Sequence, residues 1–240
     1  MRTILILLLL LPLAFVQAQT LNTLTEQEQK EGWILLFDGK TLNNWHNYNQ
    51  KTVGPAWKVM DGAIMLNAPH RSGNKTPGGG DLVTNEVFTG DFEFKIDWKV
   101  SPFANSGIFF FVNEAPEYKE IYHTGLELQV LDNAIYENAQ EDNKKRAGDL
   151  FGVISTSITE VNPVGEWNNL YVIYKKGKMK VFMNGFEIHD NNFLTPEWKN
   201  IISKTFLKDA PIGKGKYSGR IGLQDWGSTV WYRNIKARKI

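Results

Sequence analysis

One stretch decides the fold, and it runs Phe92-Glu93-Phe94-Lys95-Ile96-Asp97-Trp98-Lys99-Val100. Apolar and charged residues alternate along its whole length, so an extended chain would have one apolar side and one charged side. Successive side chains of a β-strand point to opposite faces of the sheet. The stretch therefore predicts a strand with one face in a hydrophobic core and the other face in water.

Further strand signals follow toward the C-terminus. Residues 170–175 and 179–183 flank Lys176-Gly177-Lys178, which predicts a hairpin. Asn184-Gly185 predicts a tight turn into a strand at residues 186–189. We expect residues 221–225 and 230–237 to form the last strand pair, joined around Gly227-Ser228.

Short strands with Gly and Pro between them predict a sandwich or a barrel. Thr25-Glu26-Gln27-Glu28 has the pattern of a capping box and predicts a short helix or turn before the first strands. The apolar content continues from Trp33 to Ile240 with no Pro- or Ser-rich linker. We therefore predict an all-β protein, a two-sheet antiparallel jelly-roll sandwich, in one domain over residues 19–240.

The N-terminus has the features of a Sec signal peptide. Arg2 supplies the positive charge, residues 4–16 are apolar with one proline, and Val16-Gln17-Ala18 places small residues before Gln19. We predict a signal peptide over residues 1–18 and a periplasmic or secreted protein. The apolar run is shorter than the roughly 20 residues of a membrane span. Because the sequence has no cysteine for a lipobox, we expect no membrane anchor.

Composition narrows the class of partner. The sequence has 27 Lys and Arg against 26 Asp and Glu, and a formal net charge of +1. Such a balance lacks the basic surface that nucleic acids and anionic membranes require, so we expect neither as a partner. The expected ligand is a neutral carbohydrate. A cysteine-free chain of this length, which can bury a core without disulfides, fits a bacterial periplasm.

Strand alternation selects a first set of candidate site residues. In residues 126–131, the apolar positions 126, 128 and 130 share one face, which we assign to the space between the sheets. Glu127 and Gln129 then project together from the outer face. In residues 219–226, the same rule sends Arg220, Gly222 and Gln224 outward. A glycine between two long polar side chains leaves room above the sheet, so we expect Gly222 to lie under the ligand.

A second set surrounds the segment Asn105-Ser106-Gly107, which precedes a strongly apolar strand. Phe109 and Phe111 in that strand are candidates for the floor of a sugar site. Each candidate also has a structural interpretation: the polar pairs as solvated surface, the aromatic residues as core, and His123 as a loop or capping residue. The four histidines show no His-x-His or His-Glu-x-x-His pattern, so we expect no metal site and no cofactor.

Several segments resemble a known family when they are taken together and in order. They are Trp33-Ile34-Leu35-Leu36-Phe37-Asp38-Gly39, Asn105-Ser106-Gly107-Ile108, Thr124-Gly125-Leu126-Glu127-Leu128-Gln129, Arg146-Ala147-Gly148-Asp149-Leu150 and Ile221-Gly222-Leu223-Gln224-Asp225. This pattern resembles the 3-keto-disaccharide hydrolase domain family. The resemblance covers essentially all of the chain that follows the predicted signal peptide.

The resemblance implies a fold similar to the concanavalin A-like lectins and glucanases, with a sugar-binding concave face. It also implies cleavage of glycosides that carry a ketone at C3, by 1,2-elimination, and hydration of the resulting enone. One base suffices for such an elimination because the ketone acidifies the C2 hydrogen. Direct glycoside hydrolysis needs two carboxyl groups. Gln129 stands where sandwich glucanases have their central acid, and alternation turns Asp132 away, which favours elimination.

On this interpretation, Glu127 or His123 is the C2 base, and Asp149 or Arg146 assists the C3 oxygen or the leaving group. The residues expected to hold the sugar are Asn105, Gln129, Arg220, Gln224 and Trp226. Relatives often carry His at the position of Trp226, so the resemblance implies that this chain differs from them in specificity or activity. The rival interpretations are a non-catalytic carbohydrate-binding domain and a conventional glycoside hydrolase.

Overall fold

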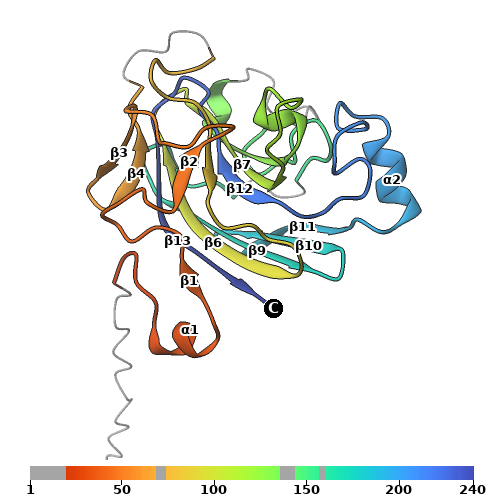
Figure 1. Cartoon of the computed structure of the whole chain (residues 1–240), viewed down its shortest axis with the longest axis horizontal. Coiled ribbons are helices and arrows are strands. Elements are labelled where there is room, and N and C mark those ends of the chain that lie inside the picture. Colours follow the sequence, from red (N-terminus) through yellow and green to blue (C-terminus); the bar gives the residue numbers. More distant parts are fainter. Residues whose placement is uncertain (1–19, 69–73, 136–143, 157–159) are drawn as a thin grey trace, which may run out of the picture.

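The structure is a computed structural model, and it describes residues 20–68, 74–135, 144–156 and 160–240. Two antiparallel β-sheets pack face to face as two layers (Figure 1). The prediction of an all-β, two-sheet antiparallel sandwich is confirmed. The predicted signal peptide lies outside the described residues, so export stays a prediction. Among the residues that are described, no helix is long and apolar enough to cross a membrane.

The larger sheet has eight strands in the order β11-β10-β9-β6-β13-β4-β3, with β1 paired to β13. They are β1 (Ile34–Leu35), β3 (Trp57–Met60), β4 (Ala63–Leu66), β6 (Phe92–Val100), β9 (Asn168–Lys175), β10 (Lys178–Met183), β11 (Phe186–Asn192) and β13 (Val230–Lys239). The smaller sheet has five strands in the order β2-β5-β12-β7-β8. They are β2 (Trp45–Asn47), β5 (Leu82–Thr84), β7 (Asn105–Val112), β8 (Leu126–Leu131) and β12 (Arg220–Leu223).

The core lies between the two layers, and β6 contributes its whole apolar side to it. The prediction for β6 is confirmed in its limits, and its apolar positions 92, 94, 96, 98 and 100 are all buried. Phe94 meets Phe110 of β7 edge to face, with ring centroids 5.8 Å apart, which joins the two sheets. Burying one such ring stabilises the fold by about 1.5–3 kcal/mol. This packing makes a rigid support for whatever lies on the outer faces.

The predicted pairing of the last two strands is wrong. β12 lies in the smaller sheet between β5 and β7, whereas β13 lies in the larger sheet between β6 and β4. The chain between them crosses from one layer to the other. Asp225 holds this corner, because its carboxylate accepts the backbone N–H groups of Thr76, Gly80 and Gly227. The Gly227-Ser228 pair between the strands therefore marks a crossover between the sheets.

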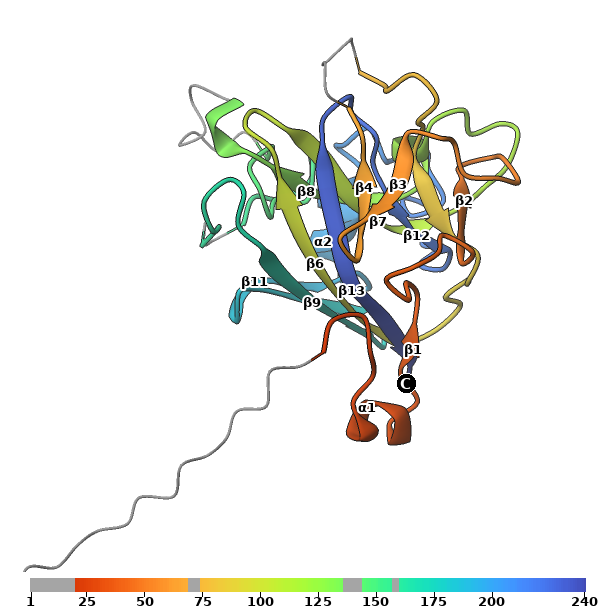
Figure 2. The same cartoon turned by 90° about the vertical axis from the view of Figure 1, so that its left-hand side faces the viewer.

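The short elements are α1 (Glu26–Lys30), α2 (Pro196–Ile202), and the 3₁₀ turns η1 (Ile121–His123) and η2 (Asn133–Ile135). The capping box of α1 is confirmed: the Thr25 hydroxyl accepts the Glu28 N–H at 3.1 Å, and the Glu28 carboxylate accepts the Thr25 N–H at 3.0 Å. α1 and β1 lie at the same end of the molecule as the C-terminus (Figure 2).

Candidate active site

A small cavity of about 180 Å³ lies on the outer face of the five-stranded sheet. Its lining includes five residues that the sequence analysis selected: Asn105, Glu127, Gln129, Gln224 and Trp226. The other described lining residues are Tyr122, Lys145 and Phe151, which the sequence analysis missed. The cavity thus brings together side chains from β7, β8, the segment after β12, and two loops.

The alternation of β8 places Glu127 and Gln129 in this cavity. Leu126, Leu128 and Val130 lie in the core between the sheets, so the two polar side chains project from the other face, as expected. The carboxyl of Glu127 extends across the neighbouring strand β7 at Gly107. A Cβ atom at Gly107 would clash with that carboxyl. The glycine of the Asn105-Ser106-Gly107 segment is therefore the residue that leaves room for Glu127.

Loop residues 148–151 extend the sheet along the free edge of β8. The backbone carbonyl of Glu127 accepts the Phe151 N–H at 2.9 Å, and the Gln129 carbonyl accepts the Gly148 N–H at 2.9 Å. These hydrogen bonds fix Phe151 as an apolar wall of the cavity. Phe151 takes this position through backbone hydrogen bonds to β8, and the sequence of the loop shows no alternation that would predict them.

Glu127 is a buried carboxyl group with an unusual proton affinity. Only 3% of the residue is exposed, and the Gln129 side-chain amide donates to its Oε1 at 3.0 Å. Burial, with a smaller contribution from the charge of Asp81, raises the pKa of Glu127 to about 8, and a hydrogen bond with Gln224 opposes both effects. A carboxylate with this pKa is a much stronger base than an exposed glutamate.

Two amide oxygens in the cavity have no hydrogen-bond donor among the described residues. They are Oδ1 of Asn105 and Oε1 of Gln129, and both residues are more than nine-tenths buried. A buried acceptor without a donor costs about 1–3 kcal/mol. Such atoms in a cavity are suited to accept hydrogen bonds from a hydroxylated ligand.

Asp81, just before β5, is a second buried carboxyl group, and the sequence analysis missed it as a site residue. Burial raises the pKa of Asp81 to about 7, although the backbone N–H of Asp225 donates to it at 2.9 Å and opposes the shift. Asp81 does not line the cavity and acts on Glu127 through its charge. The sequence feature that could have pointed to Asp81 is the run of three glycines, 78–80, directly before it. The chain packs closely there, because a Cβ at Gly79 would clash with Asp225, whose N–H donates to Asp81.

Three predicted residues lie outside the described cavity lining. Asp149 is fully buried, and its carboxylate accepts the backbone N–H groups of Arg146 at 2.8 Å and Thr156 at 2.7 Å. The Arg146 guanidinium lies 3.6 Å from the same carboxylate. These two residues organise the loop that carries Phe151. His123 is exposed, and its ring packs against Tyr122 with centroids 4.5 Å apart.

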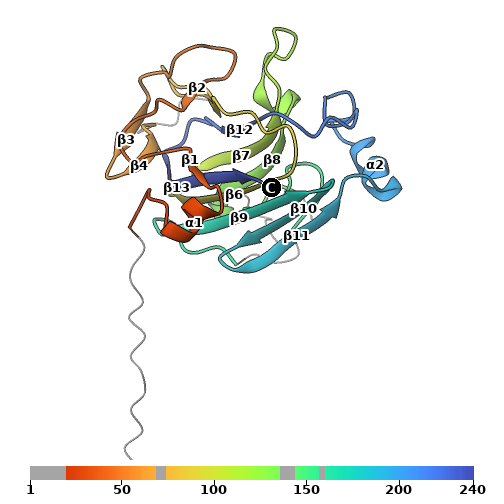
Figure 3. The ribbon, with the colours of Figure 1, turned by 60° about the horizontal axis from the view of Figure 1, so that its bottom comes forward.

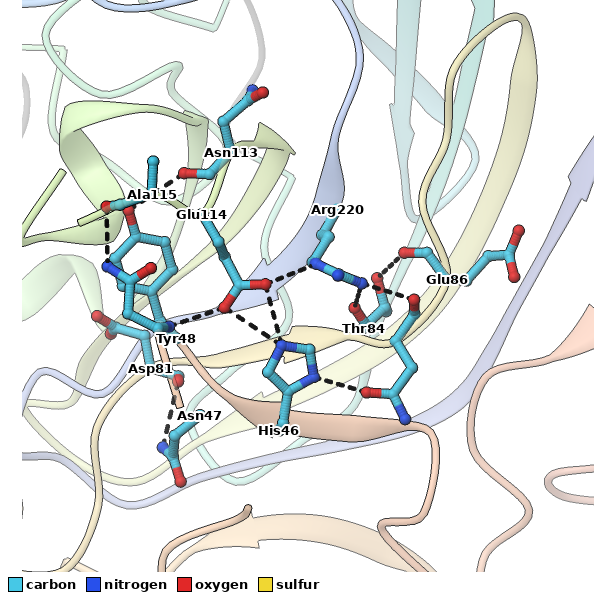
Figure 4. Close-up of polar contacts among 12 residues, drawn as sticks. His46, Asn47, Tyr48, Asp81, Thr84, Glu86, Asn113, Glu114, Ala115 and Arg220 are labelled. Carbon is cyan, nitrogen blue, oxygen red and sulfur yellow. Dashed lines mark hydrogen bonds and ion pairs between the residues drawn. The ribbon is translucent and has the colours of Figure 1, made fainter. Parts of the chain in front are cut away.

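Arg220 also lies away from the cavity lining, in a separate polar cluster (Figure 4). Its guanidinium meets the Glu114 carboxylate at 2.7 Å and donates to the carbonyls of Thr84 and Asn85. Glu114 also contacts the His46 ring at 3.0 Å. Since these partners hold its guanidinium, the structure does not bring Arg220 to the sugar site that the alternation suggested.

Two further expectations are wrong. The space above Gly222 is filled by the protein itself, because a Cβ there would lie 2.5 Å from Cδ1 of Ile121. Phe109 packs in a small apolar cluster with Ile121, whereas Phe111 lies in the main core. Phe111 has a φ of 63°, and this break in the alternation turns the two rings to opposite sides. The rings that border the cavity are those of Tyr122, Phe151 and Trp226.

Comparisons with known proteins agree with this fold and span nearly the whole chain. A sequence model of the 3-keto-alpha-glucoside-1,2-lyase-like domain matches residues 32–238. A 3-keto-disaccharide hydrolase of Bacteroides thetaiotaomicron is 30% identical over 93% of this chain and 83% of the relative. The crystal structure of a candidate glycosyl hydrolase from Parabacteroides distasonis superposes with a TM-score of 0.79 at 31% identity, over 92% of this chain and 100% of that chain.

A second crystal structure from Parabacteroides distasonis, at 22% identity and a TM-score of 0.65, shares the fold over 87% of this chain and 99% of that chain. The family match covers far more than half of the sequence and includes every residue of the cavity. The chain therefore belongs to the 3-keto-alpha-glucoside-1,2-lyase-like domain family.

Proposed function

We propose that this protein cleaves 3-keto-glycosides by elimination across C1 and C2, with Glu127 as the base. One observation carries the proposal: in a cavity of about 180 Å³, a buried carboxyl group of raised pKa lies beside amide oxygens that have no donor among the described residues. The substrate class comes from the family and from the relative named 3-keto-disaccharide hydrolase.

The chemistry begins at the C2 hydrogen, which the neighbouring C3 ketone acidifies. The Glu127 carboxylate takes this proton, and the electron pair of the C–H bond moves onto the C3 oxygen as an enolate. When the enolate collapses, the ketone forms again, a C1–C2 double bond forms, and the C1–O bond breaks. The leaving oxygen takes a proton and departs as an alcohol. Addition of water across the double bond then places a hydroxyl on C1 and a proton on C2, and releases a 3-keto sugar.

The polar lining suits the remaining tasks. The amide oxygens of Asn105 and Gln129 accept hydrogen bonds from sugar hydroxyls, and an amide N–H of Asn105 or Gln224 donates to the C3 oxygen as it gains charge. The leaving oxygen takes its proton from one of two groups in the cavity, the Lys145 ammonium or the Tyr122 hydroxyl.

The aromatic lining and the surrounding loop complete the proposal. Trp226 and Phe151 pack against the C–H face of the sugar ring and keep water away from the enolate. Arg146 and Asp149 act as positioning residues, because they hold the loop that carries Phe151. His123, which is exposed beside Tyr122, has no part in proton removal from C2 in this scheme.

The test compares two chromogenic substrates that differ only at C3. The purified protein is incubated with 4-nitrophenyl 3-keto-glucoside and with 4-nitrophenyl glucoside, and release of nitrophenol is followed. The proposal predicts release from the keto substrate alone. Equal release from the ordinary glucoside would make the protein a conventional glycoside hydrolase. Saturable binding of the keto sugar without release would make it a carbohydrate-binding domain.

A further inference from the structure

A second, larger hollow of about 520 Å³ lies on the outer face of the eight-stranded sheet. Its floor carries the charged side of β6, which the alternation alone predicts to be in water. Glu93 in this floor is instead only 7% exposed, and Lys236 of β13 is 4% exposed. The burial arises because α1 lies against the outer side of this sheet, near β9 and β13 (Figure 3). Trp33, which follows α1, adds an aromatic wall.

Each charged side chain that lines the hollow already has an ion-pair partner. Lys236 meets Glu28 of α1 at 2.6 Å, and Arg238 meets both Glu93 at 2.8 Å and Glu31 at 2.7 Å. A charged ligand would have to break these pairs and leave a partner uncompensated. A hydroxyl group donates to a carboxylate and accepts from an ammonium or guanidinium at the same time. The chemistry of the hollow therefore favours a neutral ligand that carries many hydroxyl groups.

Two aromatic rings provide the apolar part of such a site. Trp33 and Tyr171 of β9 both line the hollow, and the Lys95 ammonium lies 4.5 Å from one ring centroid and 5.5 Å from the other. Lys95 has one ion pair among the described residues, a 3.4 Å contact with Glu28. Its flexible side chain is therefore able to move aside and let the C–H face of a sugar pack against Tyr171. Trp33 is only 4% exposed and also lies under the Arg238 guanidinium, 5.1 Å from the ring centroid, so it serves as a wall of the hollow.

The same sheet face carries an excess of aromatic rings beneath cations. The described residues hold six such contacts, all on this outer face, and they involve Trp33, Trp167, Tyr171 and Trp231. A chain of this length would show about three over its whole surface. Large aromatic rings are thus concentrated on this outer face, where they are not part of the core between the sheets.

From these observations we propose that the hollow is a second, non-catalytic binding site for a neutral oligosaccharide. It has nearly three times the volume of the Glu127 cavity, so it accommodates more than one sugar ring. The two cavities lie on opposite faces of the sandwich and share no lining residue, so both are occupied independently. Because nothing in the hollow selects a ketone, this site binds unoxidised saccharides.

The experiment uses the full chain with Glu127→Gln, which removes the proposed base, and titrates it with maltotriose and with cellotriose by calorimetry. The expected result is saturable millimolar binding of at least one of them. Tyr171→Ala removes a ring that lines the hollow and weakens this binding about tenfold. Asn169→Ala removes an exposed side chain of the hollow and keeps the test valid if Tyr171→Ala folds poorly.

Two matched controls locate the binding. The Trp231 ring is on the same sheet face, under Lys99, but outside the hollow. Trp231→Ala should therefore leave the affinity for the trisaccharide unchanged. Trp226→Ala removes a ring from the Glu127 cavity and also leaves the affinity unchanged. Absence of saturable binding of both trisaccharides overturns the proposal. Binding that Trp226→Ala abolishes, and that Tyr171→Ala and Asn169→Ala leave intact, also overturns it.

Discussion

Buried carboxyl groups lie on the outer faces of both sheets, and their pKa values are shifted in opposite directions. On the smaller sheet, burial and the charge of Asp81 raise the pKa of Glu127 to about 8 against a hydrogen bond with Gln224, although Lys145 lines the same cavity. On the larger sheet, burial acts on Glu28 in the same direction, but the hydrogen bonds with Lys236 and Thr25 and the charges of Lys236 and Lys95 together outweigh it and hold the pKa of Glu28 below its usual value. The partner therefore decides whether a buried carboxyl group can act as a base or serves as one half of an ion pair.

The largest expected effect follows from removing the charge of Glu127. Glu127→Gln keeps the hydrogen bond from Gln129 and loses the base, so turnover of a 3-keto-glucoside should fall on the order of 10²–10⁴-fold while the dissociation constant changes little. Glu28→Gln is the matched control, since it removes a buried carboxylate from the other face and should leave turnover unchanged. Equal losses in both variants would mean that the contrast between the faces has no bearing on catalysis.

A smaller loss of activity is expected from a methyl group added beneath Glu127. In Gly107→Ala the new Cβ clashes with the Glu127 carboxyl and displaces it, so kcat should fall about 10–100-fold, as misplacement of a catalytic group does. Gly90→Ala is the control, because a Cβ there meets nothing within 4 Å. Wild-type kcat in a folded Gly107→Ala variant would show that the position of Glu127 is not critical.

The pH dependence sharpens the contrast further. A base must be ionised, so kcat/KM should rise with pH up to the pKa of Glu127 near 8, about tenfold per unit, and not level off near 5 as for an ordinary glutamate. The charge of Asp81 contributes to that raised pKa. Asp81→Asn should therefore shift the rising limb to lower pH and increase the relative rate near pH 6. A limb that stays in place would exclude coupling between the two carboxyl groups.

The smallest effect is on stability, and its sign differs between the faces. A raised pKa means that folded protein binds a proton that unfolded protein releases, so Glu127 lowers stability as pH rises from about 4.5 to about 8. Glu127→Gln should thus raise the melting temperature near pH 8 and change it little near pH 5. Glu28 has a lowered pKa and adds stability above its unfolded value, so Glu28→Gln should lower the melting temperature at pH 8. Shifts of the same sign would contradict the contrast.

Local patterns were sufficient for part of this molecule. Strict alternation predicted β6 to its last residue, and alternation in β8 placed Glu127 and Gln129 on the outer face. Both predictions rest on the two-residue period of a strand, which is a property of neighbouring residues alone. The same rule predicted neither the burial of Glu93 nor that of Glu127, because coverage of an outer face depends on loops and helices from elsewhere in the chain.

The remaining errors came from contacts between distant segments. Arg220 projects outward as predicted, but Glu114 from the segment after β7 holds its guanidinium. Gly222 leaves space above the sheet, and Ile121 of η1 fills it. Asp81 acts on Glu127 from the start of β5, although the two residues are far apart in sequence. A single sequence carries no signal for such pairs, so charge and side-chain size alone could not separate site residues from structural ones.

The central claim is that cleavage begins with removal of the C2 proton by Glu127. Its most direct test uses a 3-keto-glucoside with deuterium at C2, incubated with wild-type protein in ordinary water. Mass spectrometry then follows the isotope in the released 3-keto sugar. The free deuterated 3-keto sugar, incubated with Glu127→Gln for the same time, corrects for exchange in solution. Elimination followed by hydration predicts a product that has lost the deuterium to solvent. Full retention of the deuterium, together with equal initial rates for the deuterated and undeuterated substrates, would mean that the C2–D bond does not break, and it would contradict the account.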